Sequence, residues 1–129
     1  MVENLTVNLG ERSYEISFGL NHGSALRNLV GELQASGARV AVLTDAHLRA
    51  VQGKALGEMF GEAPMLAVEA GENAKSITTL GRVLEFLAEQ RLDRGGVLFA
   101  VGGGVIGDLG GFAAASYLRG IGFYQVPTT

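Results

Sequence analysis

The chain contains no cysteine, and its charged residues are not predominantly basic. Without cysteine, a disulfide framework, a thiolate metal site and a cysteine nucleophile are all excluded within these 129 residues. The 10 Lys and Arg residues against 13 Asp and Glu residues give a net charge of −3. This balance argues against nucleic-acid binding, because phosphate contacts need a clustered basic excess.

Long uninterrupted apolar runs are also missing. The most apolar stretch, residues 95–118, carries Asp108 near its middle and eight glycines, whereas a membrane-spanning helix needs about 20 predominantly apolar residues. We therefore expect no membrane span, no secretory signal and a cytoplasmic location. Charged residues interrupt the apolar positions near the N-terminus at Glu3, Glu11, Arg12 and Glu15.

Glycine is the abundant residue, with 20 among the 129, against an average usage of about 7%. Ten of these glycines follow Arg94, where the only charged residues are Asp108 and Arg119. The composition, 47% hydrophobic and 18% charged, is that of one folded domain and not of a disordered chain. A glycine-rich, nearly uncharged segment with two isolated charges predicts a buried backbone built around a ligand.

The spacing of apolar residues predicts alternating strands and helices. A β-hairpin is expected first, with strands at 5–9 and 14–18 around a turn at Gly10–Arg12. The remaining expected elements are a helix over 26–33, capped by Ser24 and ended by Gly37, a strand over 39–44, a helix over 46–60, a strand over 65–68, a helix with an apolar stripe from Ile77 to Leu87 that ends near Gly95–Gly96, a strand over 97–101, a helix over 106–118 and a strand over 123–126.

This alternation predicts a Rossmann-like, doubly wound α/β domain with a mainly parallel sheet and an N-terminal hairpin. Residues 1–129 form that single domain. The chain stops at a strand end with no polar tail, so we expect it to be part of a longer protein. Ligands bind at the carboxyl ends of the strands in such sheets. The segments to examine are Thr44–Asp45, 69–72, 102–108 and 128–129.

Gly102, Gly104 and Gly107 form a GxGxxG pattern directly after a predicted strand and at the opening of a helix. Glycines allow close backbone approach to a pyrophosphate, and the helix N-terminus favours its charge. The alternative is a glycine turn that serves tight helix–strand packing. The usual ribose carboxylate about 20 residues later is absent, because that position is about Thr128. Asp45 is the plausible substitute, although it could simply cap the helix at Ala46.

The other candidates also have two interpretations. Asp108 either accepts from ligand hydroxyls or caps a helix. Glu72 and Lys75 either form a local ion pair or belong to the ligand site. Arg119 either stabilises a helix C-terminus or binds a phosphate or carboxylate. His22 and His47 lack the spacing of metal ligands.

Two glycines inside the predicted helix over 106–118, Gly110 and Gly111, cost roughly 1 kcal/mol each relative to alanine. Something must therefore approach this helix closely, either a neighbouring helix, another subunit or a ligand.

The run Gly102–Asp108, continued through Gly111–Ala114, Arg119–Gly120 and Pro127–Thr129, closely resembles the signature of the 3-dehydroquinate synthase family. Glu72, Lys75 and Thr44–Asp45 match that family in order and spacing. The resemblance covers essentially the whole chain, as the N-terminal portion of a nucleotide-binding domain.

The resemblance implies an NAD-dependent and metal-dependent lyase of the shikimate pathway, which leads to chorismate and the aromatic amino acids. The substrate would be the sugar phosphate 3-deoxy-D-arabino-heptulosonate 7-phosphate, and the products 3-dehydroquinate and phosphate. The reaction would use transient oxidation by NAD, phosphate elimination, reduction and aldol closure. The zinc or cobalt ligands and the substrate lysines of the family lie beyond residue 129. No metal ligand is therefore expected here, and the chain alone should be inactive.

Specific roles also follow from the resemblance. Asp45 would hold the adenosine ribose, and Arg119 would reach the substrate phosphate from the neighbouring subunit of a homodimer. The small-residue helix before Arg119 would lie near that interface, where Ala114→Leu should weaken dimerisation. The implied cofactor-binding residues are Asp45, Ala70, Gly71, Glu72, Asn73, Ala74, Lys75, Gly102, Gly103, Gly104, Val105, Ile106, Gly107, Asp108, Thr128 and Thr129.

Three other functions remain open. One is a metal-dependent polyol dehydrogenase, and another is a related cyclase that makes a valiolone or inosose ring. The third is a non-catalytic nucleotide-binding or structural fragment. For the fragment, we expect a parallel sheet cut at a strand to expose an edge or a face without helices, and to associate.

Overall fold

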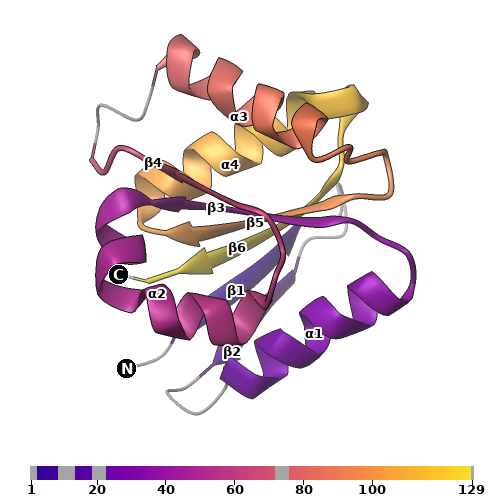
Figure 1. The fold of residues 1–129 in the computed structure, drawn as a ribbon, viewed down its shortest axis with the longest axis vertical. Coiled ribbons are helices and arrows are strands. Elements are labelled where there is room, and N and C mark those ends of the chain that lie inside the picture. The colour runs from indigo at the N-terminus through magenta and orange to yellow at the C-terminus, as the bar shows by residue number, and fades with distance from the viewer. Residues whose placement is uncertain (1–2, 9–13, 19–22, 72–75, 129) are drawn as a thin grey trace.

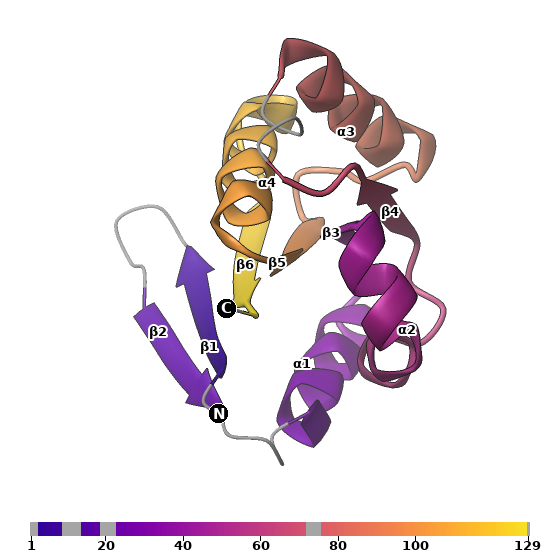
Figure 2. The same cartoon turned by 90° about the vertical axis from the view of Figure 1, so that its left-hand side faces the viewer.

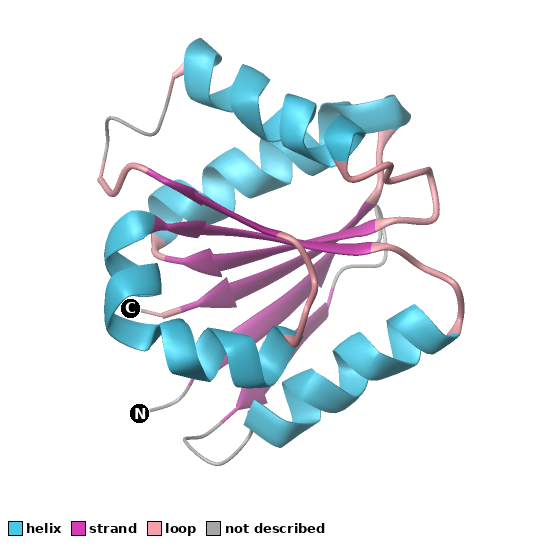
Figure 3. Ribbon diagram, in the orientation of Figure 1, coloured by secondary structure: helices cyan, strands magenta, loops and turns pink. Residues whose placement is uncertain are grey.

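A computed structural model describes residues 3–8, 14–18, 23–71 and 76–128. A six-stranded sheet is covered by α1 and α2 on one face and by α3 and α4 on the other (Figures 1 and 3). This arrangement confirms the predicted doubly wound α/β fold. The elements are β1 Glu3–Asn8, β2 Tyr14–Phe18, α1 Gly23–Ala35, β3 Val40–Asp45, α2 Ala46–Phe60, β4 Met65–Val68, α3 Ile77–Glu89, β5 Val97–Gly102, α4 Gly104–Ser116, the 3₁₀ turn η2 Tyr117–Arg119 and β6 Gly122–Pro127.

The strand order is β2-β1-β6-β5-β3-β4, and the last four strands in that order are parallel. The antiparallel hairpin β1–β2 continues the sheet beyond β6, because β1 pairs with β6 as well as with β2 (Figure 2). The last strand of the chain therefore lies inside the sheet. The expected edge at the end of the chain is absent, since β6 has a partner on each side. The predicted turn at Gly10–Arg12 lies outside the described residues.

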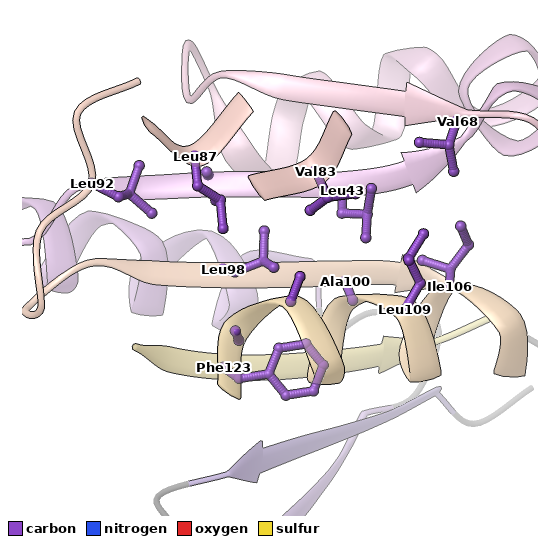
Figure 4. Packing of buried hydrophobic residues seen from close by; sticks show 13 residues of the cluster. Leu43, Val68, Val83, Leu87, Leu92, Leu98, Ala100, Ile106, Leu109 and Phe123 are labelled. Carbon is purple, nitrogen blue, oxygen red and sulfur yellow. The ribbon is translucent and has the colours of Figure 1, made fainter. Parts of the chain in front are cut away.

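The side chains of the parallel strands alternate between two cores, as expected for strands that are buried on both faces. One core joins α1 and α2 to the sheet, with Phe99 stacked on Tyr124 at a centroid distance of 4.8 Å and Phe60 edge-on to Phe99. The other core joins α3 and α4 to the opposite face (Figure 4). Its fully buried residues include Ala41, Leu43, Val83, Leu87, Leu98, Ala100 and Ala113.

Several element boundaries differ from the predictions. Helix α4 begins and ends two residues earlier than expected, so Gly104 lies inside the helix. Helix α1 begins at Gly23, and Ser24 therefore lies within its first turn. Helix α3 ends at Glu89, well before Gly95–Gly96. Ile77 opens α3 but is 89% exposed, so it is not part of the buried stripe.

The sheet itself is what approaches the glycines of α4. A Cβ built on Gly110 would lie 2.7 Å from the Cβ of Ala100 and 3.1 Å from the ring of Phe123. Ala114 is 1% exposed and packs in the same core. Ala114→Leu therefore does not report on dimerisation alone, because leucine there would overfill the core of a single chain.

Gly110→Ala should destabilise the fold, whereas the adjacent Gly111→Ala should not. The new methyl at Gly110 meets the Cβ of Ala100, which can move only with its backbone. Overpacking of this kind costs typically 1–3 kcal/mol. At Gly111 the nearest atom is the Phe123 ring at 3.5 Å, an ordinary contact. That substitution should raise the stability by up to about 1 kcal/mol through helix propensity. Urea unfolding followed by circular dichroism measures both, and equal effects would contradict the packing argument.

Candidate functional site

Four strand ends lie side by side at one edge of the sheet. The connection from β3 leads to β4 on one side, whereas the connection from β5 leads to β6 on the other. The carboxyl ends of β3 and β5 therefore form the topological switch point, where the ligand crevice of an open α/β sheet lies. Asp45 pairs with Val68 of β4, and Gly102 pairs with Pro127 of β6. The predicted segments after these four strands consequently share this edge.

Thr44 ties the two strands together at the switch point. Its hydroxyl donates a 2.8 Å hydrogen bond to the carbonyl oxygen of Val101, and the residue is fully buried. A buried hydroxyl needs such a partner, since leaving it unpaired costs about 1–3 kcal/mol. This bond holds the end of β3 level with the end of β5. The sequence identified Thr44 only as part of a strand end, and nothing in its spacing indicated the hydrogen bond to Val101.

Asp45 caps α2, as one of its two interpretations predicted. Its Oδ1 accepts a 2.7 Å hydrogen bond from the backbone N–H of Leu48, and its backbone is extended, as an N-cap requires. The side chain is partly buried at the crevice. A carboxylate has a second oxygen, so capping and ligand binding by Asp45 are compatible.

The glycine-rich turn between β5 and α4 brings a helix N-terminus to the same place. Gly102 has φ +158°, and a Cβ there would lie 3.0 Å from the Cβ of Ile106. Gly103 is the N-cap of α4 and provides no side-chain hydrogen bond. A Cβ on Gly104 would meet nothing within 4 Å. Within the described part of the chain, the start of α4 thus combines N–H groups without a side-chain cap, the positive end of the helix dipole and an open approach, which together suit a phosphate.

Gly107, the third glycine of the GxGxxG pattern, serves packing. A Cβ at Gly107 would overlap the side chain of Gln125 on β6. The packing interpretation of the motif therefore holds for Gly107, whereas the phosphate interpretation stays a prediction, with an open approach at Gly104. Gln125 was not among the predicted residues, because a polar residue in an apolar strand gave no functional signal.

The structure describes only some of the remaining predicted site residues. The backbone N–H of Thr128 donates a 3.0 Å bond to the carbonyl of Gly102, which fixes Thr128 beside the glycine turn. Ala70 and Gly71 follow β4 and are exposed. Glu72, Asn73, Ala74, Lys75 and Thr129 lie outside the described residues.

Asp108 lies on the exposed side of α4 and lines a groove of about 300 Å³ between α4 and the start of α3. The other lining residues are Ser76, Ile77, Leu80, Leu109 and Phe112. Ser76 caps α3 by accepting from the backbone N–H of Thr79 at 3.1 Å. The groove is mainly apolar and adjoins the first turns of α4.

Arg119 lies at the opposite edge of the sheet from the glycine turn. Helix α4 runs from Gly104 at the carboxyl edge to Ser116 at the amino edge, and 13 residues at about 1.5 Å each span roughly 20 Å. Arg119 follows that far end and is exposed. The structure therefore does not bring Arg119 to the site formed by Asp45 and Gly102–Gly104.

The part of the chain that the structure describes contains no cluster of metal-binding side chains. Within those residues, no group of three or more His, Asp or Glu side chains could hold a metal ion. His47 is an exposed residue of α2, and His22 lies outside the described ranges. No helix among the described elements is long and apolar enough to cross a membrane.

The fold and the site define a Rossmann-like α/β domain with a glycine-rich turn and a helix N-terminus at its switch point. The model of the family "3-dehydroquinate synthase N-terminal" matches residues 65–129. This chain belongs to the 3-dehydroquinate synthase family.

One similar relative is the 3-dehydroquinate synthase of Opitutus terrae, which is 55% identical over 100% of this chain and 36% of its own length. The chain therefore spans about a third of that relative. The crystal structure of a 2-deoxy-scyllo-inosose synthase matches 96% of this chain and 35% of its own, at 24% identity and a TM-score of 0.76. A second such structure, complexed with carbaglucose-6-phosphate, NAD+ and Co2+, matches 92% of this chain and 33% of its own, at 22% identity and a TM-score of 0.71. At these identities the two structures support the fold alone.

The two glycines of the turn should respond differently to alanine. Gly102→Ala combines a strained φ with a contact against Ile106, and we expect it to lower the unfolding free energy by about 1–3 kcal/mol. Gly104→Ala enters open space inside a helix, so stability should hold or rise by up to about 1 kcal/mol. Chemical denaturation of the two variants measures the difference. A destabilised Gly104→Ala would show that the approach to α4 is not open.

Proposed function

We propose that this chain is the N-terminal, NAD-binding part of a cytoplasmic 3-dehydroquinate synthase. The observation that carries the proposal is the start of α4, where Gly103 provides no side-chain cap and Gly104 has open space, at the same sheet edge as Asp45. Membership of the family supports it. The complete enzyme would convert 3-deoxy-D-arabino-heptulosonate 7-phosphate into 3-dehydroquinate and phosphate.

The residues at the carboxyl edge fit NAD. The N–H groups of Gly104, Val105 and Ile106 would hold the pyrophosphate, because the first turn of a helix leaves them without intrahelical acceptors. Asp45 would accept from the adenosine ribose hydroxyls with its second carboxylate oxygen while Oδ1 keeps the cap on α2. The segments Ala70–Lys75 and Thr128–Thr129, together with Gly102, Gly103, Gly107 and Asp108, would complete the contacts.

NAD, when bound, supplies transient oxidation of a ring hydroxyl, which acidifies the neighbouring C–H for phosphate elimination. The chain's own contribution is binding and orientation of the cofactor at the switch point. The zinc or cobalt ligands would lie in the part of the protein that this chain does not cover, as the resemblance to the family implies. This division of roles leaves the isolated chain without cyclase activity.

Arg119 would bind the phosphate of the sugar substrate in the other subunit of a homodimer. It lies beyond the far end of α4, roughly 20 Å from the glycine turn by helix length. An arginine side chain cannot cover that distance within one chain. The partner-subunit role of Arg119 that the family resemblance implies is compatible with this placement.

A related sugar-phosphate cyclase is the second candidate function. The solved structure with carbaglucose-6-phosphate, NAD+ and Co2+ has the same fold as this chain. The higher identity to the 3-dehydroquinate synthase of Opitutus terrae favours the first candidate.

Asp45→Ser should separate capping from cofactor binding. Serine is as good an N-cap as aspartate, so α2 and the unfolding midpoint should change little. NAD+ binding should weaken about tenfold or more, because a charge-assisted bond to the ribose is lost. Amide NMR titration with NAD+ would measure both proteins, following residues 102–108. Unchanged NAD+ affinity in the folded variant would assign Asp45 to capping alone.

Enzyme activity should appear only when the missing part is restored. The chain alone should release no phosphate from the sugar phosphate. A chimera in which it replaces the matched 36% of the Opitutus terrae enzyme should release phosphate and form 3-dehydroquinate. The intact Opitutus terrae enzyme is the reference for assay conditions. A folded chimera that binds NAD+ but accepts only another sugar phosphate would favour the second candidate.

A further inference from the structure

The chain between α4 and β6 adopts a run of left-handed backbone conformations. Leu118 has φ +50°, Arg119 has φ +67° and Gly120 has φ +119°. For residues other than glycine, each such conformation costs on the order of 1 kcal/mol or more, and it persists only where the surroundings hold it. Glycine accounts for one of the three positions, so the other two need a structural cause.

Three hydrogen bonds hold this turn. The hydroxyl of Tyr117 donates to the carbonyl oxygen of Leu92 at 2.8 Å. The N–H of Ile121 donates to the carbonyl of Ala114 at 2.9 Å, and the N–H of Gly120 donates to that of Tyr117 at 2.8 Å. The two backbone bonds close the turn on itself and on α4. The Tyr117 bond is different, because it ties the turn to the segment between α3 and β5.

The anchor of Tyr117 is rigid. Leu92 is 4% exposed and belongs to the core between α3, α4 and the sheet. The Tyr117 ring packs against the same core. The residue that precedes the left-handed run is therefore fixed at its ring, its hydroxyl and its carbonyl, while Leu118 and Arg119 remain exposed.

We propose that Tyr117 is a positioning residue for Arg119. It holds the root of the exposed arginine in a left-handed conformation, from which the side chain can meet an oxyanion of a second subunit. This inference rests on the proposed function, because it gives Arg119 a ligand in a partner's site. Tyr117 itself touches no substrate. Its contribution is to reduce the number of conformations that Arg119 must give up on binding.

The test uses Tyr117→Phe in the chimera with the Opitutus terrae enzyme. This change removes one hydroxyl and leaves the ring in the core. We expect the KM for the sugar phosphate to rise about threefold to tenfold while kcat stays within about twofold, since uniform binding of the substrate phosphate is weakened. In the isolated chain, amide hydrogen exchange at Gly120 and Ile121 should accelerate.

Two further variants make the result interpretable. Ser36→Ala removes another hydroxyl that donates to a backbone carbonyl, that of Leu33 at 2.6 Å, at the exposed end of α1. It should leave KM unchanged. Arg119→Ala should raise KM by about tenfold or more, as expected for loss of a charge-assisted phosphate contact.

The outcomes separate the two proposals. If Arg119→Ala raises KM but Tyr117→Phe does not, although it is folded, the positioning role is overturned and the phosphate role of Arg119 stands. If Arg119→Ala has no effect on KM, both the phosphate role and the positioning role fail. A parallel loss of activity in Tyr117→Phe and Ser36→Ala would show a general effect of stability and would also overturn the proposal.

Discussion

The close approach of α4 to the sheet is the constraint on which the rest of the structure depends. At Gly110 even a methyl group would lie 2.7 Å from the Cβ of Ala100, so α4 lies closer to β5 than a residue with a Cβ would allow at this position. The hydrophobic contacts of Ile106, Leu109 and Ala113 with the sheet then fix the direction of the helix. Because that direction is fixed, the N-terminus of α4 points at the switch point between β3 and β5. The C-terminus of α4 therefore lies at the opposite edge of the sheet.

The polar interactions at the switch point follow from this packing. The Thr44 hydroxyl on the Val101 carbonyl keeps the two central strands level, and the Thr128 N–H on the Gly102 carbonyl adds β6 to the same edge. Backbone groups therefore supply most of the fixed geometry, while Asp45 is the one described carboxylate that caps a helix there. A site of this kind recognises a ligand by shape and by the charge of a phosphate more than by many side-chain contacts.

The fold was predictable from the sequence because both faces of the sheet are covered. Strands β3 and β5 consist of apolar residues bounded by polar or glycine residues, and α2 begins directly after its aspartate cap, as the sequence predicted. The limits of α4 were harder to predict. Glycine is a poor helix former, so a local interpretation starts the helix after Gly104, whereas α4 begins at that residue.

The candidate site was predictable for the same reason, in its location more than in its roles. Parallel strands bring their carboxyl ends to one edge, so Asp45, Gly102 and Thr128 could be grouped from the sequence. The separate tasks of Gly104 and Gly107 could not, because they depend on whether Gln125 or open space lies opposite each glycine. The left-handed conformations of Leu118 and Arg119 could not be predicted either, since no sequence pattern indicates a positive φ for a leucine or an arginine. The hydroxyl of Tyr117, bonded to the carbonyl of Leu92 25 residues away, is one of the contacts that hold this turn.

The placement of the glycine turn and Arg119 at opposite ends of one helix has a consequence for assembly. A rigid 13-residue helix keeps them roughly 20 Å apart, and the core on its buried face prevents it from bending toward the site. If Arg119 serves the active centre of a second subunit, as we propose, each active centre combines the glycine turn of one subunit with the arginine of another. Substrate binding and subunit association would then be linked equilibria, each strengthening the other. The packing at Gly110 would thus determine the cofactor edge of one subunit and the phosphate contact that it offers to its neighbour.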